Sequence, residues 1–119
     1  MINFKDQIKL FTINNEKKIA DAIEKLNENK MKTVFVINSK NKKYIGSITD
    51  GDIRRGIIKN YSKNSSVMKI VNKRSIFFLK KPSNKILEIS FVQNFIQCIP
   101  LLNKNRIIRE IIISEDYRF

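Results

Sequence analysis

Residues 46–55 read Gly46-Ser47-Ile48-Thr49-Asp50-Gly51-Asp52-Ile53-Arg54-Arg55. An alternating apolar run ends just before them at Tyr44-Ile45, and apolar residues follow at helical spacing. This pattern predicts a strand that turns directly into a helix. Thr49 and Asp52 are three residues apart, as in a capping box, so we expect them to close the first turn of that helix.

The predicted turn has the chemistry of a site for a phosphate ester that carries hydroxyl groups. Free backbone N–H groups at the helix start, the Thr49 hydroxyl and the two arginines favour a phosphate. Asp52 does not suit a phosphate, but its carboxylate could accept hydrogen bonds from neighbouring sugar hydroxyls. Gly46 would let another group come close to the strand backbone. A nucleotide fits both halves of the turn, and a well-capped helix without a ligand fits the same residues.

The run from Gly46 to Asp52 resembles the glycine–apolar–Thr/Ser–Asp turn of CBS (cystathionine-β-synthase) domains. In that family the Thr/Ser contacts a nucleotide phosphate and the final Asp holds the ribose. The resemblance therefore implies these roles for Thr49 and Asp52. The run over residues 48–55 is similar to the CBS region that precedes bacterial sugar-phosphate nucleotidyltransferases.

Length and composition exclude several classes of protein. The chain has 119 residues, which is one domain by size, and no apolar run approaches the roughly 20 residues of a membrane span. Without histidine, and with Cys98 as the one cysteine, it has neither a Cys/His zinc site nor a Ser–His–Asp triad. We expect no catalytic group and no metal. A single cysteine forms no internal disulfide, so we expect a cytoplasmic protein.

The net charge of +13 is typical of proteins that bind nucleic acid. The lysines are spread along the chain, however, and richness in Lys, Asn and Ile is also what AT-rich codon usage produces. Specific contacts to phosphates and bases favour Arg over Lys. We therefore expect only weak, sequence-blind binding to nucleic acid at low salt.

Hydrophobic patterning predicts an α/β fold with an internal repeat. Helices are expected over residues 1–10, 16–29, 50–59, 67–71 and 84–95, and strands over 11–13, 33–37, 43–48, 76–79, 98–102 and 106–113. The order strand–helix–strand–strand therefore occurs twice, over 11–48 and over 76–113. Asn38 and Asn103 end equivalent strands, about 65 residues apart. We expect two half-domains packed about a pseudo-twofold axis.

This order resembles a tandem CBS pair over nearly the whole chain. The implied first repeat (strand–helix–strand–strand–helix) covers about 11–60, a linker covers 60–66, and a second repeat without its last helix covers about 67–116. The run Ile99-Pro100-Leu101-Leu102-Asn103 resembles the family's apolar-Pro-Val-Val-Asp strand, whereas Phe35 stands where the family often has proline. In the second half we assign Arg109 to the glycine position and Ile112 to the threonine position. One nucleotide site per chain is expected.

The resemblance implies a regulatory module with an adenine nucleotide as effector, without separating AMP, ADP and ATP. The base would lie between the backbone near Thr12-Ile13 and the strand at Thr33-Val34-Phe35. The expected nucleotide-binding residues are Gly46, Thr49, Asp50, Asp52, Arg54, Thr12, Ile13, Thr33, Val34 and Phe35. We also expect a homodimer, and an attached sugar-phosphate nucleotidyltransferase after Phe119. A dimerisation scaffold that binds no nucleotide, and a nucleic-acid-binding module, are the alternatives.

Overall fold

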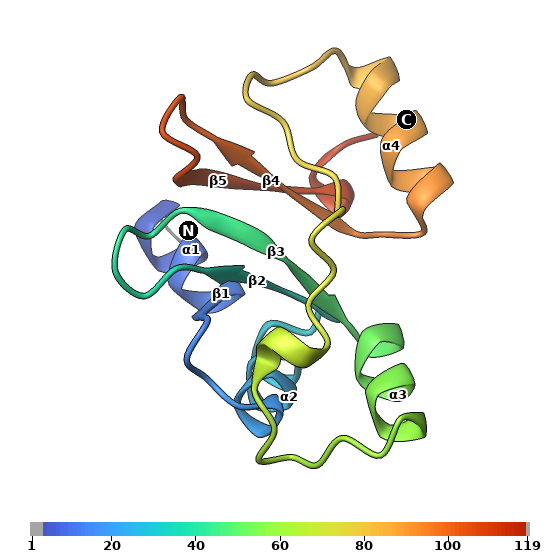
Figure 1. Cartoon of the computed structure of the whole chain (residues 1–119). Helices are drawn as coiled ribbons and strands as arrows, with labels where there is room; N and C mark the ends of the chain where they lie inside the picture. Colours follow the sequence, from blue (N-terminus) through green and yellow to red (C-terminus); the bar gives the residue numbers. More distant parts are fainter. Residues whose placement is uncertain (1–3, 119) are drawn as a thin grey trace.

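The structure is a computed structural model, and it describes residues 4–118. One sheet contains β1 (Thr12–Asn14), β2 (Thr33–Ile37) and β3 (Tyr44–Thr49), and the other contains β4 (Cys98–Leu102) and β5 (Ile108–Ile113). β1 runs parallel to β2, and the pairs β2–β3 and β4–β5 are antiparallel. The two sheets lie next to each other at the centre of the molecule, with helices around them (Figure 1).

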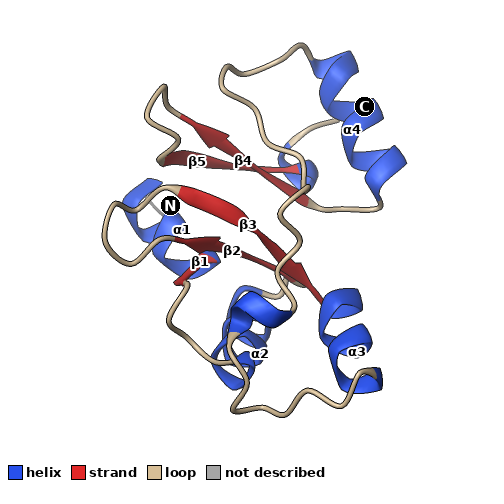
Figure 2. Ribbon diagram, viewed as in Figure 1, coloured by secondary structure: helices blue, strands red, loops and turns tan. Residues whose placement is uncertain are grey.

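The helices lie close to their predicted positions (Figure 2). They are α1 (Phe4–Phe11), α2 (Ile19–Asn29), α3 (Asp50–Ile58) and α4 (Asn84–Asn94), with two single 3-10 turns, η1 (Val67–Lys69) and η2 (Ser114–Asp116). Part of the first predicted helix, residues 1–3, lies outside the described residues. Ser83 caps α4 by accepting a hydrogen bond from the Ile86 amide, over 3.3 Å. The predicted α/β fold is confirmed, and none of the helices within residues 4–118 could span a membrane.

Alternation along the strands sorts the core into layers. In β2, Val34 and Val36 face α2 and α3, and Phe35 faces the other sheet. In β4, Ile99 and Leu101 face α4, whereas Cys98 and Leu102 face the first sheet. Apolar side chains therefore fill three regions: between the first sheet and helices α2 and α3, between the two sheets, and between the second sheet and α4.

Each half of the molecule is completed by an element from the other half. Helix α1 precedes the first sheet but packs on β5. There the side-chain amide of Gln7 donates to the Ile111 carbonyl over 3.1 Å and accepts from the Ile111 N–H over 3.3 Å. Residues 67–71 were expected to open the second repeat, yet Val67 and Ile70 are buried in the first-half core. Next to them, the backbone of Asn72 exchanges two hydrogen bonds with Ser47 of β3 (3.1 and 2.8 Å). We call α1 and η1 the crossed elements.

Residues 60–66, the predicted linker, are fastened to the start of α2. The amides of Ile19 and Ala20 donate to the carbonyls of Ser65 and Lys63, at 2.9 and 3.0 Å. The chain between the halves therefore follows the first half closely before it reaches η1.

The predicted strand over 76–79 is reduced to a single bridge. Phe78 pairs with β4 in the parallel direction, donating to Pro100 over 3.1 Å and accepting from Leu102 over 2.8 Å. The Ser75 hydroxyl is tied to the Asn72 carbonyl, which bends the chain just before this segment and leaves little of it to run beside β4.

The broad apolar stripe on α4 is only partly buried. Leu87 and Phe91 are buried under the second sheet, in positions that match Ala22 and Leu26 of α2. Other apolar residues of the stripe remain in solvent, including Val92 with 66% of its surface exposed. A small two-stranded sheet covers one face of the helix, so the rest of the stripe finds no partner within the described chain.

The strand registers correct the sequence alignment of the two halves. Gly46 pairs with Val36, and the residue that pairs with the matching Leu101 is Glu110. By the same register the counterpart of Thr49 is Ile113, because these residues pair with Thr33 and Cys98 at the start of β2 and β4. The matching positions are therefore one residue later than Arg109 and Ile112, and the second half still has neither the glycine nor the hydroxyl.

Candidate functional site

A cleft of about 270 Å³ opens at one end of the layer between the two sheets. Most of its polar lining comes from the start of α3 and the segment that leads out of η1: Thr49, Asp52, Arg55, Asn72, Arg74 and Ser75. Three further polar residues line it from β2, β3 and the end of α4: Thr33, Ser47 and Asn94. Its apolar lining comes from β2, from the segment before Phe78, and from β4 and the residues just before it: Phe35, Ile76, Ile96 and Cys98. The cleft thus has a charged, hydrogen-bonding side and an apolar side.

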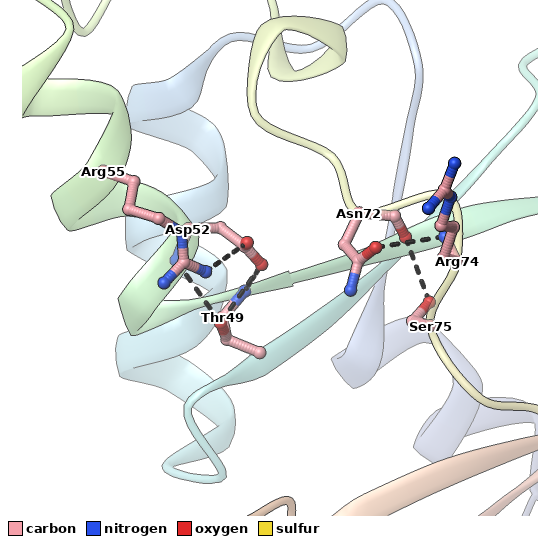
Figure 3. A network of polar contacts seen from close by, with 6 residues as sticks. All are labelled: Thr49, Asp52, Arg55, Asn72, Arg74 and Ser75. Carbon is pink, nitrogen blue, oxygen red and sulfur yellow. Dashed lines mark hydrogen bonds and ion pairs between the residues drawn. The ribbon is translucent and has the colours of Figure 1, made fainter. Parts of the chain in front are cut away.

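The start of α3 is the closed capping box that the sequence predicts. The Thr49 amide donates to Asp52 Oδ2 over 2.9 Å, and the Asp52 amide donates to Thr49 Oγ1 over 3.4 Å. The Thr49 hydroxyl also donates to Asp52 Oδ2, over 3.1 Å. Arg55 completes the group through a 2.7 Å ion pair with Asp52 Oδ1 (Figure 3). The Asp52 side chain is 11% exposed and that of Arg55 is 65% exposed.

This network leaves room for a ligand. A carboxylate offers about four acceptor positions, and three of those on Asp52 are in use. One hydroxyl can therefore bind to Oδ1 directly, and a second hydroxyl needs the place that Arg55 holds. An ion pair with one partner so exposed contributes only about 0–1 kcal/mol, so a ligand can displace it at small cost.

The opposite polar wall is built on Asn72. Its side-chain oxygen accepts from the Arg74 amide over 3.0 Å, and its carbonyl accepts from the Ser75 hydroxyl over 3.1 Å (Figure 3). Ser75 also lies 2.6 Å from the hydroxyl of Tyr44, whose pKa is raised to about 12 by burial. These bonds fix the segment against β3.

Gly46 is needed for this wall rather than for space above an open strand. A Cβ at Gly46 would lie 2.3 Å from the carbonyl oxygen of Asn72, closer than any side chain allows. The glycine at position 46 predicts that some group approaches this strand closely, but it does not identify the group. The segment 72–75 was therefore missed as part of the site.

Cys98 lies at the apolar side of the cleft as a buried, neutral thiol. Only 2% of its surface is exposed, and burial raises its pKa to about 12. Together with Phe35, Ile76 and Ile96 it offers a surface suited to a flat apolar ring. Among residues 4–118 there is no cluster of three or more His, Cys, Asp or Glu residues that could hold a metal.

Four of the expected site residues line this cleft: Thr33, Phe35, Thr49 and Asp52. Val34 is fully buried on the opposite face of β2, as alternation along a strand requires. Thr12 and Ile13 line a different hollow, beside α2, because β1 lies on the far side of β2 from β3.

The charged residues near the turn are also divided. Asp50 lines a neighbouring hollow together with Gly51 and Phe95. Arg54 is exposed and does not line the cleft, whereas Arg55, one residue later, does. On a helix that begins at Asp50, Arg55 lies three residues after Asp52 and thus on the same face.

Comparisons with known proteins agree with this architecture. Residues 6–59 match the family model for the CBS domain. The CBS domain protein PAE2072 from Pyrobaculum aerophilum, complexed with AMP, is similar with a TM-score of 0.76 and 16% identity, over 94% of this chain and 89% of that one. A putative acetoin utilization protein, AcuB from Vibrio cholerae, is similar with a TM-score of 0.76 and 17% identity, over 89% of this chain and 78% of that one.

A third similar structure is the CBS domain pair of protein MJ0100, in complex with 5′-methylthioadenosine and S-adenosyl-L-methionine. Its TM-score is 0.73 and its identity 20%, over 89% of this chain and 86% of that one. The sequence has no significant match among curated proteins. The chain thus has the fold of a tandem CBS domain pair, and its residues 6–59 match the CBS family itself.

Proposed function

We propose that this chain is a regulatory module that binds one adenine nucleotide in the cleft between its two sheets. The observation that carries the proposal is the position of the capping pair: Thr49 and Asp52 line a cleft that also has apolar residues in its lining, among them Phe35 and Ile96. Support also comes from solved structures of the same fold, one complexed with AMP and one with two adenosyl compounds.

In this proposal each part of the nucleotide meets a group of matching chemistry. The ribose hydroxyls donate to Asp52, and the phosphate lies at the Thr49 hydroxyl and the N-terminus of α3. The base lies against Phe35 and Ile96 rather than near Thr12. The ligand would touch residues of both halves, so it favours whichever arrangement of the halves closes the cleft, and this differential affinity is the basis of regulation.

We propose further that the regulated enzyme is a sugar-phosphate nucleotidyltransferase attached to this module, as the resemblance of residues 48–55 implies. The test is to measure nucleotidyl transfer by the joined protein with and without AMP. Activity that does not respond to AMP in the joined protein would contradict it.

A homodimer is proposed from the exposed apolar residues of two helices. Ile57 and Ile58 of α3, and Ile89 and Val92 of α4, keep 44–79% of their surfaces in solvent. Burial of such residues against a second copy is favourable by about 25 cal/mol for each Å² of apolar surface. Light scattering should give twice the chain mass, and Val92→Glu should shift the equilibrium toward the monomer.

Calorimetric titration with AMP tests the proposed site. Asp52→Ala should weaken AMP by about 1.5–3 kcal/mol, the usual range for hydrogen bonds to a charged group. The control is Asp116→Ala. Asp116 is the third residue of η2, as Asp52 is the third residue of α3, but the N-cap of η2 is Ile113, whereas the N-cap of α3 is Thr49. Its AMP affinity should equal that of the unmodified protein.

Three outcomes would redirect the proposal. AMP binding that survives Asp52→Ala removes the ligand from this cleft. A dimer that binds no adenine nucleotide is the scaffold alternative. Sequence-selective binding of DNA or RNA that persists at about 0.2 M salt, where phosphate contacts are strongly weakened, favours the nucleic-acid alternative.

A further inference from the structure

A second hollow adjoins the nucleotide cleft along the side of α3. It has a volume of about 370 Å³, and its lining includes three cationic side chains, those of Arg55, Lys59 and Lys69. Asp52, Arg55 and Asn72 line both hollows, so the two are neighbours that share a wall. We call this second space the basic hollow.

The basic hollow follows from helical spacing. Asp52, Arg55 and Gly56 lie on one face of α3, and the C-cap residue Lys59 follows at the spacing that brings successive turns into line. That face is directed at η1 and the residues after it. Gly56 allows a close approach there, since a Cβ would lie 2.7 Å from Ile70 Cγ2.

The charge balance of this space favours a polyanion. Asp52 is the one acidic residue in the lining, and its Oδ1 is already paired with Arg55 at 2.7 Å. Lys59 and Lys69 line the same space from the C-terminal cap of α3 and from η1, and both are exposed. A phosphate chain is the ligand class that suits closely placed cations beside a nucleoside site.

We propose that the basic hollow holds the phosphate tail of a nucleotide whose nucleoside lies in the cleft, so that ATP binds more tightly than AMP or adenosine. This inference rests on the proposed function and adds to it a preference among effectors. It also separates this protein's effector from adenosyl compounds that carry no phosphate.

Arg55 links recognition of the sugar to recognition of the tail. When ribose hydroxyls donate to Asp52, they compete for the oxygen that the guanidinium now occupies. The freed guanidinium remains at the wall shared by the two hollows, where its planar fork can bind phosphate oxygens in pairs. The ion pair of the free protein thus keeps the cation in place until a nucleotide arrives.

The experiment is a calorimetric titration of adenosine, AMP, ADP and ATP at one fixed salt concentration. The protein is compared with the double variant Lys59→Gln/Lys69→Gln. A matched control, Lys40→Gln/Lys104→Gln, removes the same charge from two exposed lysines that line neither hollow. Circular dichroism of each variant checks that the fold is intact.

ATP should bind at least about tenfold more tightly than AMP to the unmodified protein, a difference of about 1.4 kcal/mol. The variant Lys59→Gln/Lys69→Gln should lose most of this difference and keep its adenosine affinity. The control variant should bind all four ligands within about twofold of the unmodified protein, because distant exposed charges are largely screened.

Other outcomes separate this inference from the function on which it rests. If AMP binds as tightly as ATP, or if both double variants lose the same ATP affinity, the basic hollow holds no tail and the nucleotide site stands. If inorganic tripolyphosphate binds the hollow while ATP gains nothing over AMP, the hollow takes free anions, and the inference is wrong. If none of the four ligands binds, the proposed function itself fails.

Discussion

Thr49 and Asp52 combine a structural role with the proposed role in binding. Their side chains accept hydrogen bonds from each other's backbone amides at the start of α3, and both residues line the cleft. A ligand at this site therefore has to share acceptors that already stabilise the helix. Substitutions here should change both stability and affinity, and the two effects can be separated only with matched controls.

We expect Thr49→Val to weaken AMP more than adenosine, because it deletes the hydroxyl at the phosphate end of the site. It also removes a helix cap, at a cost of about 1 kcal/mol in unfolding free energy. Thr12→Val is the control: its hydroxyl donates to the Ile8 carbonyl over 2.8 Å and lies outside the cleft. Titration and urea denaturation of both variants should show lost stability in each but lost AMP affinity in Thr49→Val alone.

The two glycines beside the turn should respond in opposite ways to an added methyl group. Gly46→Ala would press against the Asn72 carbonyl, so we expect the unfolding free energy to fall by about 1–3 kcal/mol. At Gly51 the added Cβ would meet only the flexible end of Arg55, at 3.2 Å. Gly51→Ala should be neutral, or stabilise α3 by up to about 1 kcal/mol. Equal losses in the two variants would contradict the role given to Asn72.

At the scale of elements, α1 acts as a part of the second half. The Gln7 side chain makes with Ile111 the pair of hydrogen bonds that the Asn72 backbone makes with Ser47. A contact through the Gln7 side chain keeps the backbone of α1 farther from β5 than the backbone of Asn72 is from β3. Glu110 is therefore tolerated where the first half needs Gly46. The same architecture is thus reached through two different kinds of contact.

Gln7→Ala should lower the unfolding free energy by about 1–3 kcal/mol, because two hydrogen bonds are lost and two backbone groups of β5 lose their partner. Gln93→Ala, on the exposed side of α4, is the control and should stay within about 0.5 kcal/mol of the unmodified protein. Urea denaturation of both variants decides the matter. A loss no larger than that of the control would mean that α1 contributes little to the second half.

The elements show where sequence reasoning works and where it stops. The capping box at Thr49, the strands of both sheets and the cap at Ser83 depend on neighbours in sequence, so local patterns predict them. The Asn72 wall and the exposed side of α4 depend on which distant segments meet, which one sequence does not encode locally. Arg55 was within reach, because its spacing from Asp52 alone puts both on one helical face.

At the scale of the whole molecule, the layer between the sheets contains two ionisable groups in neutral form. Burial raises the pKa of Tyr44 from 10.0 and that of Cys98 from 9.0, each to about 12. The unfolded chain therefore loses these protons at lower pH than the folded protein does. Stability from these groups is complete below about pH 9 and is lost as the pH rises toward 12.

We expect the unfolding free energy to be flat from pH 7 to 8.5 and to fall by pH 10.5. The variant Cys98→Ala should fall less between pH 9 and 10, because only Tyr44 then titrates between the sheets. Urea denaturation across this range measures the effect. Equal slopes for the two proteins would show that the thiol is not protected as its burial indicates.

The crossed elements also determine the order in which contacts can form during synthesis on the ribosome. Gln7 of α1 bonds to Ile111, which is translated 104 residues later. At about 5–20 residues per second, α1 emerges roughly 5–20 s before its partner strand exists. The side of α1 that packs on β5 has no partner during that interval, and the first sheet also waits, more briefly, for η1. Helix α1 therefore cannot complete its packing until β5 has been synthesised.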